Sequence, residues 1–346
     1  MTSKIKIALI APESLTVPPK DYGGIEAVVY NLAKGLEELG KDVTVICREG
    51  STYGGKKIIS GIEGPHGEDG IKNYLHNMGD LSEFDVIHDH MTGATKCKVS
   101  SEKILTTLHW NHTGLSAGFY NVNCISHSQR NWLMNEWKRE FKQTEGKGKI
   151  KDAPVVQHGL DPNEFRMNEN VKDYNLYLSK VAKYKGADIL VDLVKSMPNE
   201  NFVVAGSNGD YMGILKEVSN KYNNLKYVGE VSYEEKLELY ANAKLFIFPT
   251  GGYDQLWKEP FGIVMIEAMM AGIPILSTRN GETPYIVKDG INGFLCDSVN
   301  DFVKHINTIE DVDMSKKSIR EYGIKNFSNV KMANEYYKLY EKLLEE

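Results

Sequence analysis

The chain has 346 residues, more than one domain usually contains, which predicts two domains of ordinary dimensions. Its 41 Lys and Arg residues against 47 Asp and Glu residues give a formal net charge of −6, which argues against a general nucleic-acid-binding protein. The four cysteines form no C-x-x-C pair, which indicates reduced thiols in a cytoplasmic protein. There is no signal-peptide pattern and no apolar run near the ~20 residues of a membrane span, so we expect a protein that is soluble or at most peripheral.

In the first half of the chain, apolar runs alternate with helical patterns. A strand is expected over residues 5–11 and a helix over 25–39, where apolar residues recur at helical spacing until Gly40. Strands separated by helical stretches predict a parallel sheet. The further expected strands are 43–47, 85–88, 104–109, 122–126 and 155–158.

A glycine pair, Gly23 and Gly24, lies between the first expected strand and its helix. A phosphate or a sugar could approach the bare backbone there, at a helix N-terminus. A simple turn is the alternative interpretation, and the chain lacks the G-x-G-x-x-G pattern of dinucleotide sites.

His109 follows an apolar strand and is therefore expected at the carboxyl edge of the sheet, where open α/β sheets bind ligands. A structural histidine in a loop is an equally good interpretation of the local sequence. His88, Asp89, His90 and His112 are expected at the same edge, but their spacing matches no known metal-ligand set, so no metal site is predicted.

The segment from Arg130 to Lys151 mixes aromatic residues with lysines and arginines. It could contact an anionic membrane or bind an acidic acceptor. Core aromatics beside a solvated face explain the same composition, and we favour that interpretation.

A second alternating series begins at Tyr174 and predicts a second domain of the same architecture. The linker is expected over residues 161–173, where Pro162 and polar residues interrupt the periodicity. A helical pattern covers residues 330–344. The expected strands of this second series are 176–182, 202–205, 225–228 and 245–248.

Two cations five positions apart, Lys180 and Lys185, are expected near a strand end and the start of the next helix. Gly186 follows Lys185 directly. Fixed cations can stabilise the charge that builds on a departing diphosphate. Two solvated lysines are the alternative in a chain this rich in lysine.

The nonapeptide that runs from Glu259 to Glu267 sets two carboxylates eight positions apart around a turn that opens a helix. Gly262 lets backbone come close to a ligand, and the free N–H groups of a first helical turn suit an anion. The natural partners of carboxylates beside a diphosphate are hydroxyls, which sugars supply in adjacent pairs. A helix cap with a surface ion pair would explain either carboxylate alone, but not the whole block.

This block resembles the E-x7-E block of the retaining glycosyltransferases of family four, and further segments resemble that family in the family's order along the chain. Lys180 and Ser179 stand where the family usually has Arg and Gly, and Tyr285 stands where it usually has Glu. The resemblance implies the GT-B fold, an α/β architecture of two facing Rossmann-like domains with a catalytic cleft between them. It divides the chain into an N-terminal acceptor domain (1–165), a C-terminal nucleotide-sugar donor domain (166–325) and a C-terminal helix (326–346) that crosses back to the N-terminal domain.

The resemblance implies a retaining, metal-independent hexosyltransferase without a cofactor. It would move a hexose from a nucleotide diphosphate sugar, UDP-glucose first and GDP-mannose second, to a hydroxyl of a glycan, glycolipid or other acceptor. The implied catalytic residues are His109, Lys180, Lys185 and Glu259. The implied donor-binding residues are Gly23, Gly24, Gly206, Val231, Phe261, Gly262, Ile263 and Glu267.

Two other functions fit two Rossmann-like domains. A sugar-nucleotide 2-epimerase would need no acceptor, but it would lack the E-x7-E context. A catalytically inactive sugar-nucleotide-binding protein would keep the scaffold without the reaction.

Overall fold

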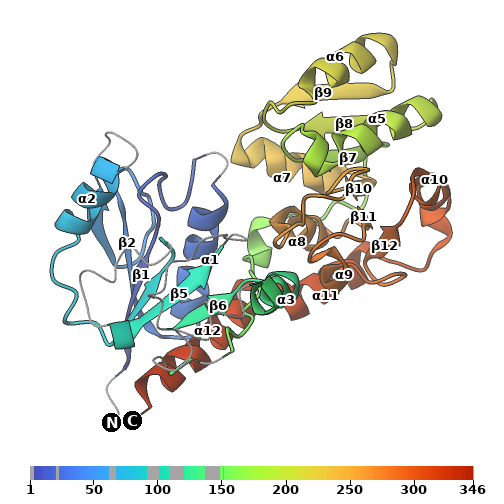
Figure 1. Cartoon of the computed structure of the whole chain (residues 1–346). Helices are drawn as coiled ribbons and strands as arrows, with labels where there is room; N and C mark the ends of the chain where they lie inside the picture. The colour runs from blue at the N-terminus through green and yellow to red at the C-terminus, as the bar shows by residue number, and fades with distance from the viewer. Residues whose placement is uncertain are drawn as a thin grey trace. The chain divides into compact units, whose positions relative to one another are not determined.

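The computed structural model describes residues 4–20, 23–61, 68–91, 101–109, 121–136, 149–150 and 152–345. The chain forms two compact units, one of residues 1–161 with 327–346 and one of residues 162–326. Each unit is built on its own sheet (Figure 1). Within the described ranges, no helix has both the length and the apolar character needed to cross a membrane.

The first unit contains a six-stranded parallel sheet in the order β3-β2-β1-β4-β5-β6. This is the strand order of a Rossmann-like sheet, in which successive strands are added on one side of β1 up to β3 and on its other side from β4 onward. The strands are β1 (Lys6–Ile10), β2 (Asp42–Arg48), β3 (Lys57–Gly61), β4 (Val86–Asp89), β5 (Ile104–Leu108) and β6 (Val122–Cys124). The helices are α1 (Gly24–Glu38), α2 (Glu68–Asn77), α3 (His127–Glu136), the 3-10 turn η2 (Ser101–Lys103) and α12 (Asn329–Leu344).

The second unit repeats this architecture with the strand order β12-β11-β10-β7-β8-β9. All of its strand pairs are parallel. The strand order changes direction between β7 and β10, which are neighbours in the sheet. The strands are β7 (Asn175–Leu178), β8 (Phe202–Ala205), β9 (Leu225–Gly229), β10 (Leu245–Phe248), β11 (Ile275–Thr278) and β12 (Gly293–Cys296). The helices are α5 (Ala187–Ser196), α6 (Met212–Lys221), α7 (Tyr233–Asn242), α8 (Ile263–Met270), α9 (Thr283–Ile286), α10 (Val299–Thr308) and α11 (Lys316–Phe327). The 3-10 turns are η3 (Pro162–Glu164), η4 (Lys183–Lys185) and η5 (Ile309–Asp311).

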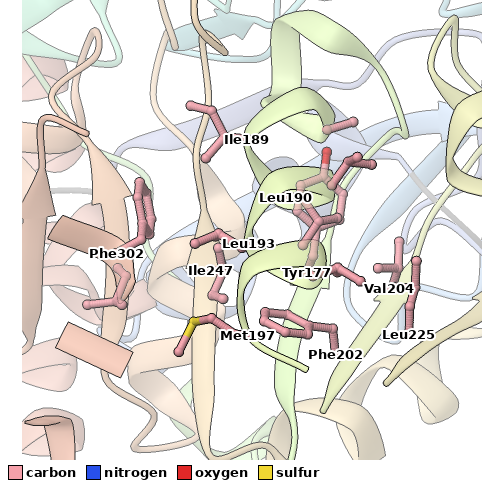
Figure 2. Close-up of a cluster of buried hydrophobic side chains, with 14 of the residues drawn as sticks. Tyr177, Ile189, Leu190, Leu193, Met197, Phe202, Val204, Leu225, Ile247 and Phe302 are labelled. Atoms are coloured by element: carbon pink, nitrogen blue, oxygen red, sulfur yellow. The ribbon is translucent and has the colours of Figure 1, made fainter. Parts of the chain in front are cut away.

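The core of the second unit explains why its helices cover the sheet. Figure 2 shows Leu190 and Leu193 of α5 packed with Ile247 of β10 and Phe302 of α10. All four side chains are buried, and each contributes about 1.5–3 kcal/mol by leaving water. The α10 and α7 helices begin with capping boxes, Ser298 with Asp301 and Ser232 with Glu235, which fix where each helix starts.

The C-terminal helix α12 packs against α1 in the first unit. Gly35 permits this close approach, because a Cβ added there would lie 2.4 Å from the carbonyl oxygen of Asn329. Tyr336 and Tyr340 project from α12 into the interior and are fully buried. The last helix therefore completes the core of the first unit.

One strand expected from the sequence is reduced to a single bridge. Residues 155–158 pair with β6 only where Val155 lies opposite Cys124. The proline at position 154 has no N–H to donate, and β6 is only three residues long, so the pairing ends there.

Candidate active site

Glu259 is held by both its backbone and its side chain. Its N–H donates to Oδ1 of Asn280 over 2.8 Å, and its carbonyl oxygen accepts from the N–H of Glu282 over 3.1 Å. Its carboxylate accepts from the Thr250 hydroxyl at 2.9 Å and forms an ion pair with Lys185 at 2.7 Å. Only 5% of Glu259 is exposed, so these contacts determine where its carboxylate lies.

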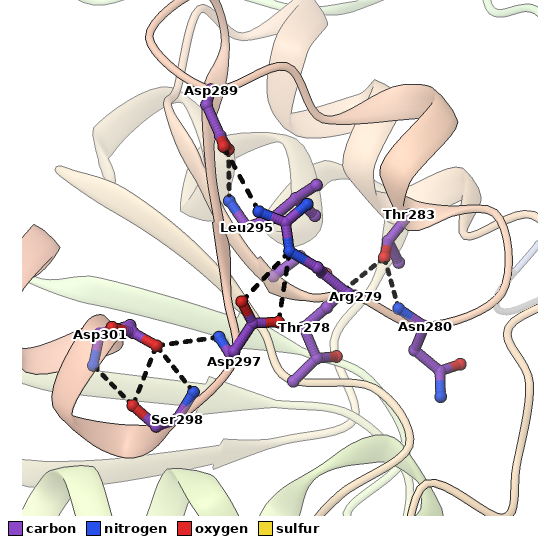
Figure 3. A network of polar contacts seen from close by, with 10 residues as sticks. Thr278, Arg279, Asn280, Thr283, Asp289, Leu295, Asp297, Ser298 and Asp301 are labelled. Atoms are coloured by element: carbon purple, nitrogen blue, oxygen red, sulfur yellow. Dashed lines mark hydrogen bonds and ion pairs between the residues drawn. The ribbon is translucent and has the colours of Figure 1, made fainter.

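The turn after β11 provides the support for Glu259. The Asn280 side-chain amide donates to Oε1 of Gln255 at 2.7 Å and to the carbonyl of Trp257 at 2.8 Å. The Asn280 N–H donates to the Thr283 hydroxyl at 2.9 Å (Figure 3). Gly281 has a φ of +54°, and a Cβ there would lie 2.1 Å from the Glu259 carbonyl oxygen, so only glycine fits. Asn280 thus ties the segment before Glu259 to the end of β11.

Figure 3 also shows how the end of β11 is tied to its neighbours. Arg279 forms ion pairs with Asp289 at 3.6 Å and with Asp297 at 3.2 Å. Arg279 is about half exposed, so these pairs contribute little stability.

Lys185 lies at the junction of η4 and α5, where Gly186 makes a left-handed turn. Gly186 has a φ of +80°, and a Cβ there would lie 1.9 Å from the carbonyl oxygen of Pro249. The buried hydroxyl of Tyr177 lies 3.0 Å from the carbonyl oxygen of Lys180 and 3.1 Å from that of Lys185, and it shares its proton between them. The Tyr177 hydroxyl therefore helps to hold in place the backbone that carries both lysines.

The two lysines have different surroundings. The Lys185 ammonium lies 5.1 Å from the centre of the Trp257 ring and 5.7 Å from that of Tyr184, within the range of cation–π attraction. Lys180 is exposed to solvent. Lys185 is thus a largely buried cation that is 17% exposed, whereas Lys180 is exposed.

Glu267 lies on α8, four residues after the first residue of the helix. Its Oε1 pairs with the Lys236 ammonium at 2.6 Å, and its Oε2 accepts from the Tyr240 hydroxyl at 3.0 Å. Lys236 and Tyr240 are four residues apart on α7 and so share one face of that helix.

The N-terminus of α8 has the geometry that the sequence predicts. Gly262 is its N-cap, with a φ of +85°, and it provides no side-chain cap for the first turn. The first N–H groups of α8, beginning with that of Ile263, have no side-chain cap and can therefore bind an anion. Phe261, just before the turn, is buried.

Gly206 and Val231 lie at the carboxyl ends of β8 and β9. Gly206 has a φ of +137°, a Cβ there would lie 2.0 Å from the Ser179 carbonyl oxygen, and its N–H donates to Gly229 at 2.9 Å. Val231 is half-buried and immediately precedes Ser232, the N-cap of α7. Both positions lie at the sheet edge where Rossmann-like folds bind nucleotides.

In the first unit, Gly23 and Gly24 lie at the start of α1. A Cβ on Gly23 would lie 2.7 Å from Cβ of Pro19, whereas a Cβ on Gly24 would meet no described atom within 4 Å. Close packing therefore requires Gly23, while Gly24 leaves space beside the helix N-terminus. Glu26 of the same turn is buried, and burial raises its pKa.

His109 directly follows β5 and belongs to a cluster of buried histidines. Its Nε2 lies 2.9 Å from Nδ1 of His90, and its ring stacks on that of His158 at 5.5 Å between centroids. Burial lowers the pKa of His88 and of His158 to about 3, and it holds the pKa of His90 well below its ordinary value. This cluster forms within the first unit, and burial favours the neutral form of His88, His90 and His158.

The predicted site residues are divided between the two units. The second unit brings Lys185 to Glu259, and gives Glu267 its own partners, Lys236 and Tyr240. His109, Gly23 and Gly24 belong to the first unit. The membrane or acceptor prediction for residues 130–151 falls largely on residues 137–148 and 151, which lie outside the described ranges.

Sequence analysis did not identify Asn280, Thr250, Tyr177, Lys236 or Tyr240. The spacing of Lys236 and Tyr240 on one helix face was the only available signal, and that spacing is common on solvated helices. Among the described residues, no group of three or more His, Cys, Asp or Glu side chains is placed to hold a metal ion.

Two doubly wound parallel sheets, the second with two lysine–carboxylate ion pairs, define a two-domain protein of Rossmann-like α/β architecture. Residues 162–326, the whole second unit, match the family model described as glycosyl transferases group 1. An uncharacterized glycosyltransferase of Methanocaldococcus jannaschii is 28% identical over 55% of this chain. That match spans 54% of the relative, about half its length.

Solved structures show the same fold over nearly the whole chain. A glycosyltransferase involved in avilamycin A biosynthesis is 24% identical, with a TM-score of 0.72 over 98% of both chains. Anabaena HepE, solved in complex with UDP and glucose, is 16% identical, with a TM-score of 0.71 over 96% of this chain and 99% of its own. The second unit belongs to the group 1 glycosyltransferases and the chain has the GT-B fold, which confirms the predicted family, fold and enzyme class.

Proposed function

We propose that this glycosyltransferase is retaining and metal-independent, and that it transfers a hexose from a nucleotide diphosphate sugar to an acceptor hydroxyl in glycan or glycolipid biosynthesis. UDP-glucose is the first candidate donor and GDP-mannose the second. The observation that carries the proposal is the pair of buried carboxylates, Glu259 and Glu267, on either side of the uncapped N-terminus of α8.

The arrangement suggests a division of roles. The N-terminus of α8 and Lys185 would bind the diphosphate, because an N–H cluster and an ammonium both favour negative charge. Glu259 would orient hydroxyls of the sugar, and Glu267 the diol of the ribose. Lys180 would add positive charge near the diphosphate, and His109 would contact the sugar near its reacting carbon.

The Lys185–Glu259 ion pair bears on the charge available for catalysis. A buried ammonium needs a counter-charge, and Glu259 supplies it at 2.7 Å. As the sugar–phosphate bond breaks, the departing diphosphate gains charge, and Lys185 can stabilise that charge more strongly than it stabilises the ground state.

The reaction proposed for the acceptor needs no dedicated protein base. The acceptor hydroxyl would attack the sugar from the face that the diphosphate leaves, so the configuration is retained. A diphosphate oxygen would take the hydroxyl proton, and the products would be the glycoside and the nucleoside diphosphate. UDP-glucose is favoured as the donor because HepE, which shares the fold, was solved with UDP and glucose.

Kinetics of two variants test these roles. Glu267→Ala should mainly raise the donor KM, because it removes a binding contact common to ground and transition states, whereas Lys185→Ala should mainly lower kcat. We expect about tenfold or more in each parameter. Lys183→Ala is the matched control, because Lys183 is an exposed lysine of the same turn whose ion pair is with Asp254. Small and equal effects of Glu267→Ala and Lys185→Ala would contradict the assignments.

A further inference from the structure

The protons of the buried network around His88 can be placed one by one. The Thr107 hydroxyl donates its single proton to Oδ1 of Asn123 at 2.8 Å, while the Asn123 amide nitrogen donates to the Tyr336 hydroxyl at 3.1 Å. Thr107 can then only accept, from Tyr336 at 3.1 Å and from Nε2 of His88 at 2.6 Å. His88 is therefore protonated at Nε2, and its Nδ1 accepts from the Tyr340 hydroxyl at 2.7 Å.

His90 packs against this fixed ring and reaches His109. The ring centroids of His88 and His90 are 4.1 Å apart, and Nδ1 of His90 lies 2.9 Å from Nε2 of His109. One proton lies between those two nitrogens, so either His90 donates or His109 donates.

The other nitrogen of His90 decides between these arrangements. Nε2 of His90 is buried and has no hydrogen-bond partner among the described residues. If His109 donated, neutral His90 would carry its proton on Nε2, as a buried N–H without an acceptor. If His90 donates through Nδ1, Nε2 is left only with a lone pair. Orphaned buried N–H groups are the rarer of the two in proteins, so the second arrangement is favoured.

The electrostatics of the cluster agree with a neutral His90. Burial is the largest cause that lowers the pKa of His90, and the neighbouring rings of His88, His109 and His158 lower it further. A cationic His90 that donates from both nitrogens is therefore disfavoured.

We propose that His90 is a positioning residue that fixes His109 as the tautomer protonated at Nδ1. With its Nε2 accepting from His90, neutral His109 has no lone pair left to take a proton from an acceptor hydroxyl. His109 is therefore not available as a general base, and any hydrogen bond from its ring to the sugar would be a donated one. The role at the sugar rests on the proposed function, whereas the tautomer does not.

Nitrogen-15 spectra of histidine in the full-length protein at pH 7.5 test the tautomer directly. The ring signals can be assigned with His109→Gln and His90→Asn. We expect a protonated Nδ1 and an unprotonated Nε2 for His109, with the shared proton attached to Nδ1 of His90. A proton on Nε2 of His109, or a doubly protonated ring, would overturn the proposal. This result does not depend on finding a donor, so it separates failure of the tautomer from failure of the proposed function.

Kinetics with the best donor test the positioning role. His90→Phe keeps a ring without a donor, and it should lower kcat about tenfold or more with the donor KM within about twofold, as expected for a misaligned catalytic histidine. His90→Asn places an amide N–H where Nδ1 lies and should retain kcat within about threefold. Equal losses in the two variants would refute the hydrogen bond as the cause, and should His90→Phe fail to fold, the wild-type spectrum and His90→Asn still decide.

Discussion

Glu259 and Glu267 are buried carboxylates, and each contacts both a lysine ammonium and a hydroxyl in the second unit. In the first unit, burial lowers the pKa of His88 and His158 and keeps these two histidines neutral. Charged groups are thus concentrated where we propose a diphosphate and a ribose bind. Neutral hydrogen-bonding rings lie beside the residue proposed to contact the sugar.

The neutral histidines should make the stability of the protein depend on pH. Each binds a proton in the unfolded chain below a pKa of about 6.5, but in the folded protein His88 and His158 bind one only near pH 3. Stability is therefore complete above about pH 6.5 and falls as the pH drops below it. At pH 5.5 the loss is roughly 1 kcal/mol for each histidine.

Urea unfolding at pH 7.5 and pH 5.5 measures this loss. His158→Gln should reduce the difference between the two pH values by about one histidine's share, whereas His76→Gln, which changes an exposed residue of α2, should leave it unchanged. An equal pH dependence in wild type and His158→Gln would show that His158 is not the cause.

Asn280 should matter for catalysis because it holds the backbone of Glu259. Asn280→Ala removes the acceptor for the Glu259 N–H and two contacts that fix the preceding segment. We expect kcat/KM for the donor to fall about tenfold, since small displacements of a reacting group are costly. Arg279→Ala is the matched control, because Arg279 is the adjacent exposed residue and should change kcat/KM less than about twofold. Similar effects of both substitutions would argue against a specific role for Asn280.

The residues that sequence analysis identified and those that it did not differ in a physical way. Glu259, Gly262 and Glu267 belong to one contiguous block, so spacing alone revealed them. Asn280 supports Glu259 from 21 positions away, and Lys236 reaches Glu267 from 31 positions away. Such contacts depend on tertiary packing, which local periodicity does not encode.

At the scale of elements, the fold class was predictable because strands alternate with helices in both halves of the chain. Strand β3 was not expected, although β2 and β1 were, because Lys56 and Lys57 interrupt its apolar pattern. Strands β11 and β12 were not among the strands expected from the sequence. Short strands gain their stability from pairing on a sheet, which a single sequence does not reveal.

The packing of α12 on α1 gives a prediction about stability. Gly35→Ala should destabilise the protein by about 1–3 kcal/mol, because the new Cβ would lie 2.4 Å from the Asn329 carbonyl oxygen and force α12 away. Gly213→Ala on α6 is the control, since a Cβ there meets no described atom within 4 Å and should stabilise by about 0.5–1 kcal/mol. Urea unfolding compares the two. An unchanged free energy of unfolding for Gly35→Ala would mean that the helices do not pack as described.

At the scale of the whole molecule, two units with the same strand order come from one chain. In each unit, the place where the strand order changes direction leaves room for ligand-binding loops at the carboxyl ends of the strands. His109 and His90 lie at this edge in the first unit, and Glu259 lies there in the second. The sequence predicted this duplicated architecture, and the comparisons place the second unit among the group 1 glycosyltransferases. The donor sugar, the base and the acceptor depend on loop side chains that fold class does not determine.

The most direct test of the proposed function is a panel of UDP- and GDP-sugars, with thermal stability and released nucleoside diphosphate measured first without added metal and then with EDTA. The proposed function predicts that one donor, UDP-glucose first, raises Tm and is slowly cleaved at the same rate with EDTA, and that Lys185→Ala cleaves it more slowly. Failure of every sugar nucleotide to raise Tm, or cleavage that requires a metal ion, would contradict the donor site proposed here.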